Sequence, residues 1–566
     1  MNLRIARMDR DSASRLPGRL LRSVVPRLRS MVAWLLAAVA AVWSIDSGGR
    51  AFSAETGPVP NIVLILADDM GYSDLGCYGG EILTPNLDKL AAGGLRFTQF
   101  YNAARCCPTR AALMTGMYPH QTGVGLMMED YRRPGYKGNL ARECATIAEV
   151  LRLGGYQTMM CGKWHLTRFV EPGGPKHTWP LQRGFDKFYG TIHGAGSYFD
   201  PVTLTRDDQF VTIPQGAYYY TDAISDHAAA YVESAARSGR PFFLYVAYTA
   251  PHWPLHAPPE VVSRYQGKYA VGWEELRKKR YERMTALGII KPKWPLSPQD
   301  PRVTDWEREP YKTWQQRRME VYAAQVDVMD AGVGRILEKL RQTGAERNTL
   351  VMFLSDNGGC AEEVGPKWEG LHIPAKTPAG KAVLLGNNPD VLPGPADTYQ
   401  SYGIGWANAS NTPFRLYKHW THEGGIATPL IVSWPGVIES RGGLTQQIGH
   451  VIDIMPTCVE AAKIKFPQHL GGYTLAQPVG QSLIPIFQGK TRPQPLLYWE
   501  HEGNRAVRDG KWKLVSQYPG PWELYDMEAD RTEQNDLAAR FSVIVQSMSK
   551  MYDAWAKRSN VEQWRQ

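Results

Sequence analysis

Asn61-Ile-Val-Leu-Ile-Leu-Ala67, followed at once by Asp68 and Asp69, is the stretch from which the architecture of this chain is best approached. An apolar run of this length, bounded by polar residues, is typical of a strand buried on both faces of a parallel sheet. Comparable runs occur at 242–247 and 350–354, with helix-like stretches between them. The sequence therefore predicts an α/β fold with a large, mainly parallel central sheet flanked by helices.

The helices and the domain division follow from local signals. Helices are expected to start at Thr84-Pro85 and at Thr146. Apolar residues spaced three and four positions apart from Val326 to Leu340 predict an amphipathic helix. Residues 254–312, rich in proline and charge, are interpreted as a solvated helical excursion rather than a binding patch. Residues 364–411 form a long, weakly periodic segment of the kind that is usually functional. We predict a larger domain over 55–435 and a smaller C-terminal α+β domain over 436–566.

The net charge of +9, from 64 basic and 55 acidic residues among 566, comes mostly from the N-terminus. Residues 1–54 hold nine arginines and three aspartates, which leaves 55 basic and 52 acidic residues in the remainder. This small excess of basic over acidic residues does not indicate a nucleic-acid-binding surface. A hydrophobic content of 43% excludes a disordered polymer as well.

Residues 1–54 have the form of a secretory signal peptide, with an arginine-rich stretch, an apolar run from Met31 to Trp43 and small residues up to Ala54. The apolar run is shorter than the about 20 residues that cross a bilayer. We therefore expect an exported protein, periplasmic or secreted, without a stable membrane anchor; an uncleaved anchor helix is the alternative. The seven cysteines are few and odd in number and imply no disulfide framework.

Polar side chains follow several of the predicted strands. Asp68 and Asp69 follow the first, and Asp356 and Asn357 follow the strand at 350–354. Ligands bind beyond the carboxyl ends of parallel strands, and a set of oxygen donors suits Ca²⁺ or Mg²⁺. Each pair alone could be a turn or a helix cap, so it is their joint placement that favours a metal site.

Lys163, His165 and His252 also stand just after predicted strands, at 157–160 and 242–247. They are candidates for anion contacts and proton transfer, although each could be a structural residue. In Cys106-Cys107-Pro108-Thr109-Arg110, the proline near the start of an alanine-rich stretch places Cys106 at a helix N-terminus, where backbone N–H groups favour an anion. Arg110, one turn on, can point to the same place. A thiolate nucleophile and a buried structural cysteine both fit this segment.

These residues resemble the sulfatase family, whose Cys-x-Pro-Ser/Thr-Arg signature matches Cys106 to Arg110. Asn61–Asp69, Gly162–His165, Pro251-His252, Asp356–Gly359, Asn411–Gly425 and Glu523–Asp526 resemble other segments of the family. The resemblance is greatest to bacterial arylsulfatases and implies an alkaline phosphatase-like fold, with the catalytic domain at 55–435. It further implies that a separate maturation enzyme oxidises Cys106 to formylglycine. Cys107 cannot be the modified residue, because proline would then have to stand at Thr109.

The resemblance also implies a role for each matching residue. Asp68, Asp69, Asp356 and Asn357 would hold Ca²⁺ together with the hydrated aldehyde at position 106, whose hydroxyl attacks sulfur. Arg110, Lys163 and Lys418 would neutralise the sulfuryl oxygens. His252 or Lys418 would protonate the leaving oxygen, and His165 would accept the proton of the second hydroxyl.

The leading hypothesis is therefore a hydrolase of sulfate monoesters. A phosphomonoester or phosphonate-ester hydrolase of the same superfamily is a second possibility, and a non-catalytic binder of sulfated glycans is a third. The sequence does not distinguish an aryl sulfate from a sulfated glycan as substrate, because loops such as 190–222 and 364–411 would form the pocket walls.

Overall fold

The computed structural model describes residues 59–564, so the predicted leader lies outside the described residues. Its largest element is an eleven-stranded sheet in the order β12-β2-β11-β8-β1-β7-β3-β4-β5-β6, with β13 pairing beside β2. Strands β8, β1, β7, β3 and β4 run parallel, and β11 is antiparallel to β8. The predicted α/β architecture is confirmed. The strands are β1 (Asn61–Ala67), β2 (Leu95–Tyr101), β3 (Gln157–Lys163), β4 (Lys187–Thr191), β5 (Leu204–Arg206), β6 (Gln209–Phe210), β7 (Phe242–Ala247), β8 (Thr349–Ser355), β11 (Ala427–Ser433), β12 (Gly443–Thr445) and β13 (Gly449–His450).

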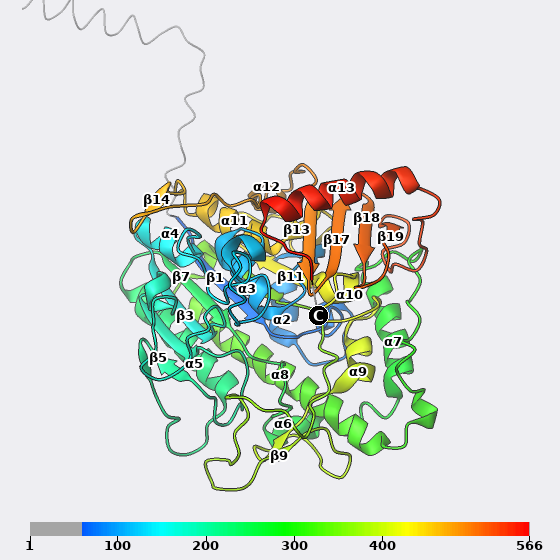
Figure 1. Cartoon of the computed structure of the whole chain (residues 1–566). Coiled ribbons are helices and arrows are strands. Elements are labelled where there is room, and N and C mark those ends of the chain that lie inside the picture. Colours follow the sequence, from blue (N-terminus) through cyan, green and yellow to red (C-terminus); the bar gives the residue numbers. More distant parts are fainter. Residues whose placement is uncertain (1–58, 565–566) are drawn as a thin grey trace, which may run out of the picture. The chain divides into compact units, whose positions relative to one another are not determined.

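Helices cover both faces of this sheet, which explains why its central strands are apolar throughout. Figure 1 shows α4 (Ile147–Leu153) and α11 (Ile454–Ala461) above the strands and α5 (Tyr220–Arg237) and α8 (Lys312–Gln342) below them. Helix α3 (Cys106–Thr115) packs with α4 and α11, whereas α2 (Pro85–Ala92) packs with α8.

The predicted helix starts are confirmed, and the long helix is longer than predicted. Thr146 caps α4: its hydroxyl accepts a hydrogen bond from the Glu149 N–H at 3.1 Å, and the Glu149 carboxylate accepts one from the Thr146 N–H at 2.8 Å. Helix α8 starts at Lys312, well before Val326. Its first half was missed because buried polar residues such as Arg318 interrupt the apolar spacing.

The helical character predicted for residues 254–312 is confirmed by α6 (Pro259–Val262) and α7 (Gly272–Ala286). The prediction that this excursion is solvated is wrong for part of α7. Two of the four basic residues at 277–280, Arg277 and Arg280, are buried. Arg280 forms ion pairs with Asp74 at 2.6 Å and Glu81 at 2.8 Å. Arg280 is thus used in internal ion pairs, whereas Lys278 and Lys279 are exposed. The sequence of this run does not show which of its basic residues are buried.

The long segment 364–411 contains little regular structure: β9 (Leu384–Leu385), β10 (Thr398–Tyr399) and α9 (Gly403–Ser410). It is followed by α10 (Glu423–Ile426), which leads into the central strand β11.

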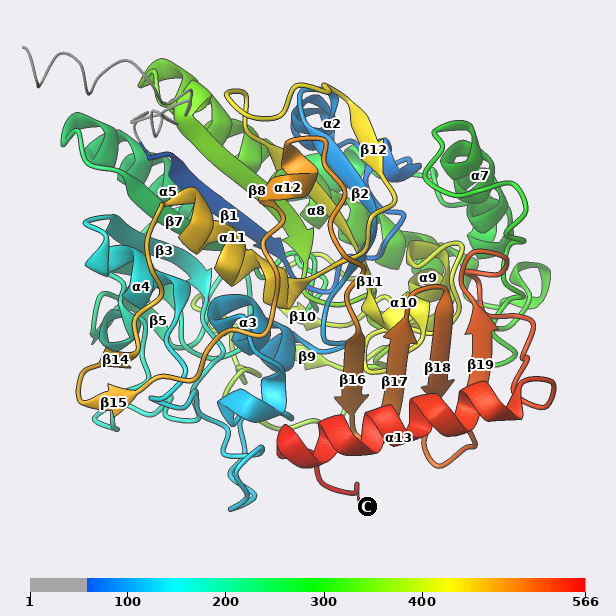
Figure 2. The same cartoon turned by 90° about the horizontal axis from the view of Figure 1, so that it is seen from above.

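A separate antiparallel sheet forms the C-terminal part, as predicted. Helix α13 (Ser542–Arg558) lies across its four strands (Figure 2), and Trp555 stacks on Tyr498 with ring centroids 5.1 Å apart. The strands that directly follow residue 435, β12 and β13, pair with β2 of the central sheet, so the division at 435/436 stays a proposal. The C-terminal elements are β14 (His469–Leu470), β15 (Tyr473–Thr474), α12 (Ile484–Phe487), β16 (Leu497–His501), β17 (Asn504–Asp509), β18 (Trp512–Ser516) and β19 (Glu523–Asp526).

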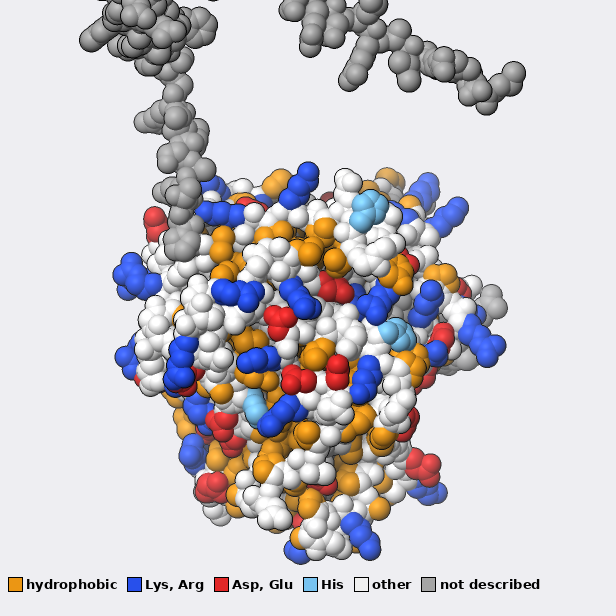
Figure 3. All heavy atoms as spheres, turned by 90° about the vertical axis from the view of Figure 1, so that its left-hand side faces the viewer, with side chains coloured by type: hydrophobic (Ala, Val, Ile, Leu, Met, Phe, Trp, Pro, Cys, Tyr) orange, Lys and Arg blue, Asp and Glu red, His pale blue; other side chains and the backbone are white. Residues whose placement is uncertain are grey.

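Basic and acidic side chains are interspersed on the face of the molecule that Figure 3 shows. Among residues 59–564, no helix combines the length and apolar character that crossing a membrane requires.

Candidate active site

The carboxyl ends of β1 and β8 bring four oxygen-bearing side chains together. Ala67 and Ser355 are partners in the parallel register, so the residues after them become neighbours. The Asp69 N–H donates to Asp356 Oδ1 at 3.2 Å, and Asn357 Nδ2 donates to Asp69 Oδ1 at 2.6 Å. Asp69 takes a left-handed backbone conformation, φ +66°, which turns the chain at the strand end. The structure thus places Asp68, Asp69, Asp356 and Asn357, all buried, in one cluster.

This cluster fits a hard divalent cation. Asp68 Oδ1 and Asn357 Oδ1 are buried and have no hydrogen-bond partner, which is costly unless something binds them. Carboxylate and amide oxygens are the donors that Ca²⁺ prefers. A half-turn of the Asn357 amide would present its oxygen where its nitrogen now meets Asp69.

Cys106 is the first residue of α3, which begins directly after the extended Arg105 and ends at Gly116. The Cys106 side chain lines a cavity of about 490 Å³. Cys107 does not line the cavity; its Sγ lies 3.2 Å from His165 Nε2. The adjacent cysteines therefore have different surroundings, and only the first faces the space that a substrate could occupy.

Three cations surround the acidic cluster. Arg110 donates to Asp356 Oδ2 from Nε at 3.1 Å and from Nη2 at 2.8 Å. Lys163 Nζ lies 2.6 Å from Asp68 Oδ2, and Lys418 Nζ lies 3.0 Å from Asp69 Oδ2. All three predicted anion-binding residues are thus brought to the cluster, where their charges offset those of the carboxylates.

The protonation of the cluster reflects this crowding. Burial and the neighbouring charge of Asp68 raise the pKa of Asp356 well above its usual range. For Asp68, burial acts in the same direction, but Lys163, His252 and Arg110 outweigh it and lower the pKa. A hydrogen bond from Cys107 lowers the pKa of the Cys106 thiol well below its usual range, with help from Lys163 and His165. This end of the cavity therefore stabilises negative charge at residue 106.

The two predicted histidines lie on either side of this point. Burial lowers the pKa of His165 to about 4, so its ring is neutral at pH 7 and able to accept a proton. His252 Nε2 lies 3.4 Å from both Asp69 Oδ2 and Lys418 Nζ. The His252 ring is oriented through Nδ1, which is 2.7 Å from the Trp253 carbonyl oxygen.

Sequence reasoning missed Glu362, which connects several of these groups. Its carboxylate lies 3.6 Å from Lys418 Nζ and 2.9 Å from Arg105 Nη1, and it accepts a hydrogen bond from Trp253 Nε1 at 2.9 Å. These partners come from distant parts of the chain, so no local pattern signals them. The position of Glu362 just beyond the Asp356–Gly359 segment was the only available hint.

The two predicted loops contribute part of the cavity walls. His193 belongs to residues 190–222, and Trp368 and His372 belong to residues 364–411. The rings of His193 and His372 stack with centroids 5.2 Å apart, and Trp253 meets Trp368 edge to face at 5.5 Å.

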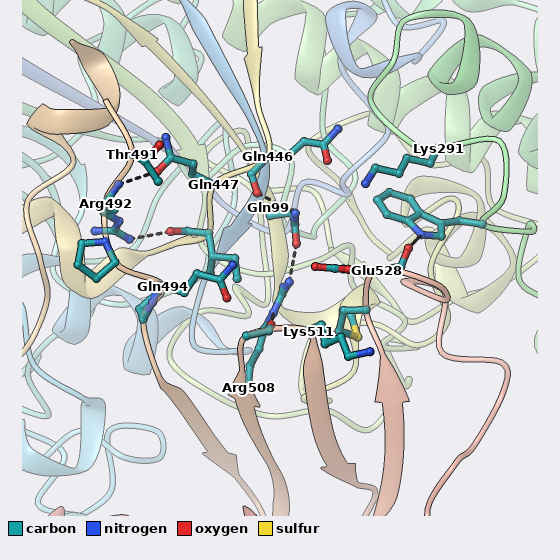
Figure 4. A pocket seen from close by; sticks show the side chains of 16 residues that line it. Gln99, Lys291, Gln446, Gln447, Thr491, Arg492, Gln494, Arg508, Lys511 and Glu528 are labelled. Atoms are coloured by element: carbon teal, nitrogen blue, oxygen red, sulfur yellow. Dashed lines mark hydrogen bonds between the residues drawn. The ribbon is translucent and has the colours of Figure 1, made fainter. Parts of the chain in front are cut away.

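A second hollow, shown in Figure 4, lies beside β17 and contains none of the predicted site residues. Several of its polar groups form hydrogen bonds with one another. Arg508 Nη2 donates to Gln99 Oε1 at 2.5 Å, and Gln99 Nε2 donates to the Gln446 carbonyl oxygen at 2.8 Å.

The chain is similar to known proteins over most of its length. The family model for sulfatases matches residues 60–464, and the model described as N-sulphoglucosamine sulphohydrolase, C-terminal, matches residues 414–556. An arylsulfatase of Klebsiella aerogenes is 34% identical over 472 residues, covering 80% of this chain and 97% of the relative. Arylsulfatase A of Homo sapiens is 30% identical over 486 residues, covering 80% and 74%.

Among solved structures, Ps i-CgsB in complex with k-i-k-neocarrahexaose is similar, with a TM-score of 0.63 and 26% identity over 90% of this chain and 95% of that one. The family match spans most of the chain and includes the acidic cluster, the Cys106 helix and Lys418. The chain belongs to the sulfatase family.

Proposed function

We propose that this protein hydrolyses sulfate monoesters, with residue 106, oxidised to formylglycine, as the nucleophile and Ca²⁺ as the metal. The observation that carries the proposal is the meeting of Cys106, Arg110, Lys163 and Lys418 with four buried oxygen-bearing side chains at one end of a cavity. A maturation enzyme that converts Cys106 and export through the N-terminal leader belong to the same proposal.

Asp68, Asp69, Asp356 and Asn357 would hold the metal. A hydrated aldehyde beside Ca²⁺ supplies an acidified hydroxyl nucleophile. The unpartnered Asp68 and Asn357 oxygens support this arrangement. The Asp356 carboxylate would receive the proton of that hydroxyl.

The cations of the chain would bind the sulfuryl group. Arg110, Lys163 and Lys418 are held in place by buried carboxylates, so they need little reorganisation as charge develops on the sulfuryl oxygens. His252 and Lys418 lie together on the Asp69 side, and either could deliver a proton to the leaving oxygen. The neutral ring of His165, close to Cys106, is placed to accept the proton of the second hydroxyl.

The test is a comparison of sulfate and phosphate esters of the same aryl alcohol on purified protein with added Ca²⁺. We expect sulfate ester turnover to exceed phosphate ester turnover by at least about tenfold, because the family model for sulfatases matches residues 60–464 of the chain. Faster phosphate release would identify a phosphomonoester hydrolase instead, and release of neither would contradict both hydrolytic functions.

A further inference from the structure

The cavity has an acidic outer rim. Glu129 and Glu369 line it and are exposed, and neither forms an ion pair among residues 59–564. The basic side chains of the lining are already engaged: Arg105 with Glu362, Arg168 with Asp130 at 2.9 Å, and Lys418 with Asp69. A second anionic group of a substrate, lying beyond the proposed sulfate-binding end, would therefore meet two negative charges and no unpaired basic side chain of the lining.

The cavity wall other than the acidic rim and the proposed sulfate-binding end is uncharged. Met127, Met128, Trp253 and Trp368 contribute apolar and aromatic surface. The histidines of the wall do not act as cations at neutral pH, because burial lowers the pKa of His193 to about 3 and that of His372 to about 4. Such a surface packs against an uncharged ring and provides no attraction for a polyanion.

An apolar hollow of about 460 Å³ lies next to the cavity. The two share Val170, and the neighbouring residues Leu371 and His372 line one hollow each. The far side is formed by Phe210, Val211 and Ile213, and Leu371 is 45% exposed. No basic residue lines this hollow, and its single acidic residue, Asp200, has no ion-pair partner among residues 59–564.

We infer that the hollow beyond Val170 is a second substrate subsite, and that the substrates are monosulfate esters of uncharged ring-containing alcohols that carry an apolar extension. The inference rests on the proposed function of the adjoining site. The ring lies against the aromatic wall, the extension lies in the hollow, and Glu129 and Glu369 repel esters with further anionic groups.

The experiment compares kcat/KM for three sulfates: 4-nitrophenyl sulfate, 4-octylphenyl sulfate, and a glucosamine that carries two sulfate groups. For the native protein we expect kcat/KM for the octyl compound to exceed that for 4-nitrophenyl sulfate by about tenfold, because the octyl group is buried in the hollow. We expect the disulfated sugar to be the poorest substrate at low salt.

Two substitutions test the two parts of the subsite. Leu371→Ser is expected to remove most of the preference for the octyl compound and to leave 4-nitrophenyl sulfate unchanged, whereas the matched change Leu153→Ser, at a residue 57% exposed on α4, alters neither. Glu369→Gln is expected to raise kcat/KM for the disulfated sugar by up to about fivefold at low salt, with the gain lost at high salt. The control is Glu439→Gln, at an exposed glutamate outside both hollows.

Failure of the subsite and failure of the proposed function give different results. If no sulfate ester is hydrolysed, the proposed function is wrong and the subsite falls with it. If 4-nitrophenyl sulfate is hydrolysed but the disulfated sugar is preferred, or Leu371→Ser leaves the preference for the octyl compound intact, the inference is overturned while the hydrolytic function stands.

Discussion

Cys106→Ala is expected to lower sulfate release by roughly three orders of magnitude or more, since it removes the proposed nucleophile. Cys107→Ser is expected to retain most of the activity. Cys106 lines the cavity at the start of α3, whereas Cys107 does not line it and meets His165. A serine hydroxyl at 107 can still hydrogen-bond that ring. The measurement is the initial rate of sulfate release by the two variants and the native protein.

Both variants change a buried residue of the same helix, so each serves as the folding control of the other. Melting temperatures close to that of the native protein would exclude loss of structure as the cause. Equal loss of activity in the two variants would refute the assignment of the nucleophile to position 106.

Asp356→Asn is expected to reduce both activity and Ca²⁺ retention, the activity by about 10²-fold or more. Asp356 meets Arg110 through two hydrogen bonds and accepts one from the Asp69 N–H, so it connects the proposed metal ligands to a cation that we propose binds the sulfate. Asparagine keeps the shape and removes the charge. It avoids the larger disruption of alanine, which would leave Arg110 buried beside an empty space.

Elemental analysis of the purified variant measures the bound Ca²⁺. The matched control is Asp330→Asn, because Asp330 is also a buried aspartate, but it accepts hydrogen bonds from Asn86 and Leu87 at the start of α2, and it is not part of the acidic cluster. We expect Asp330→Asn to lower stability and keep native Ca²⁺ content. Native Ca²⁺ content in Asp356→Asn would argue that the metal lies elsewhere.

Local pattern was sufficient for the sheet and for much of the site. The apolar run Asn61–Ala67 is typical of a doubly buried strand, and the rule that ligands bind beyond parallel strand ends put Asp68 and Asp356 in one place. Proline and glycine at the ends of α3 located Cys106 at the helix start in the same way. These features depend on a few neighbouring residues, so they can be predicted without a structure.

The missed features depend on partners far away in the chain. Glu362 contacts Arg105, Trp253 and Lys418. These three residues are far apart in the sequence, so no local pattern predicts that they meet at one carboxylate. Arg280 was interpreted as solvated because its buried partners, Asp74 and Glu81, lie about two hundred residues earlier. The same limit applies to the cavity walls, whose loops have no periodic pattern.

The central claim is that residue 106 acts as an oxidised side chain. Its most direct test is the mass of the peptide that contains residues 106 and 107, taken from active protein produced together with a formylglycine-generating enzyme. We predict that this peptide has lost the sulfur and hydrogen of the thiol and one hydrogen of Cβ, and gained an aldehyde oxygen at position 106, in proportion to the specific activity. A fully active preparation in which both cysteines remain unmodified thiols would contradict the account.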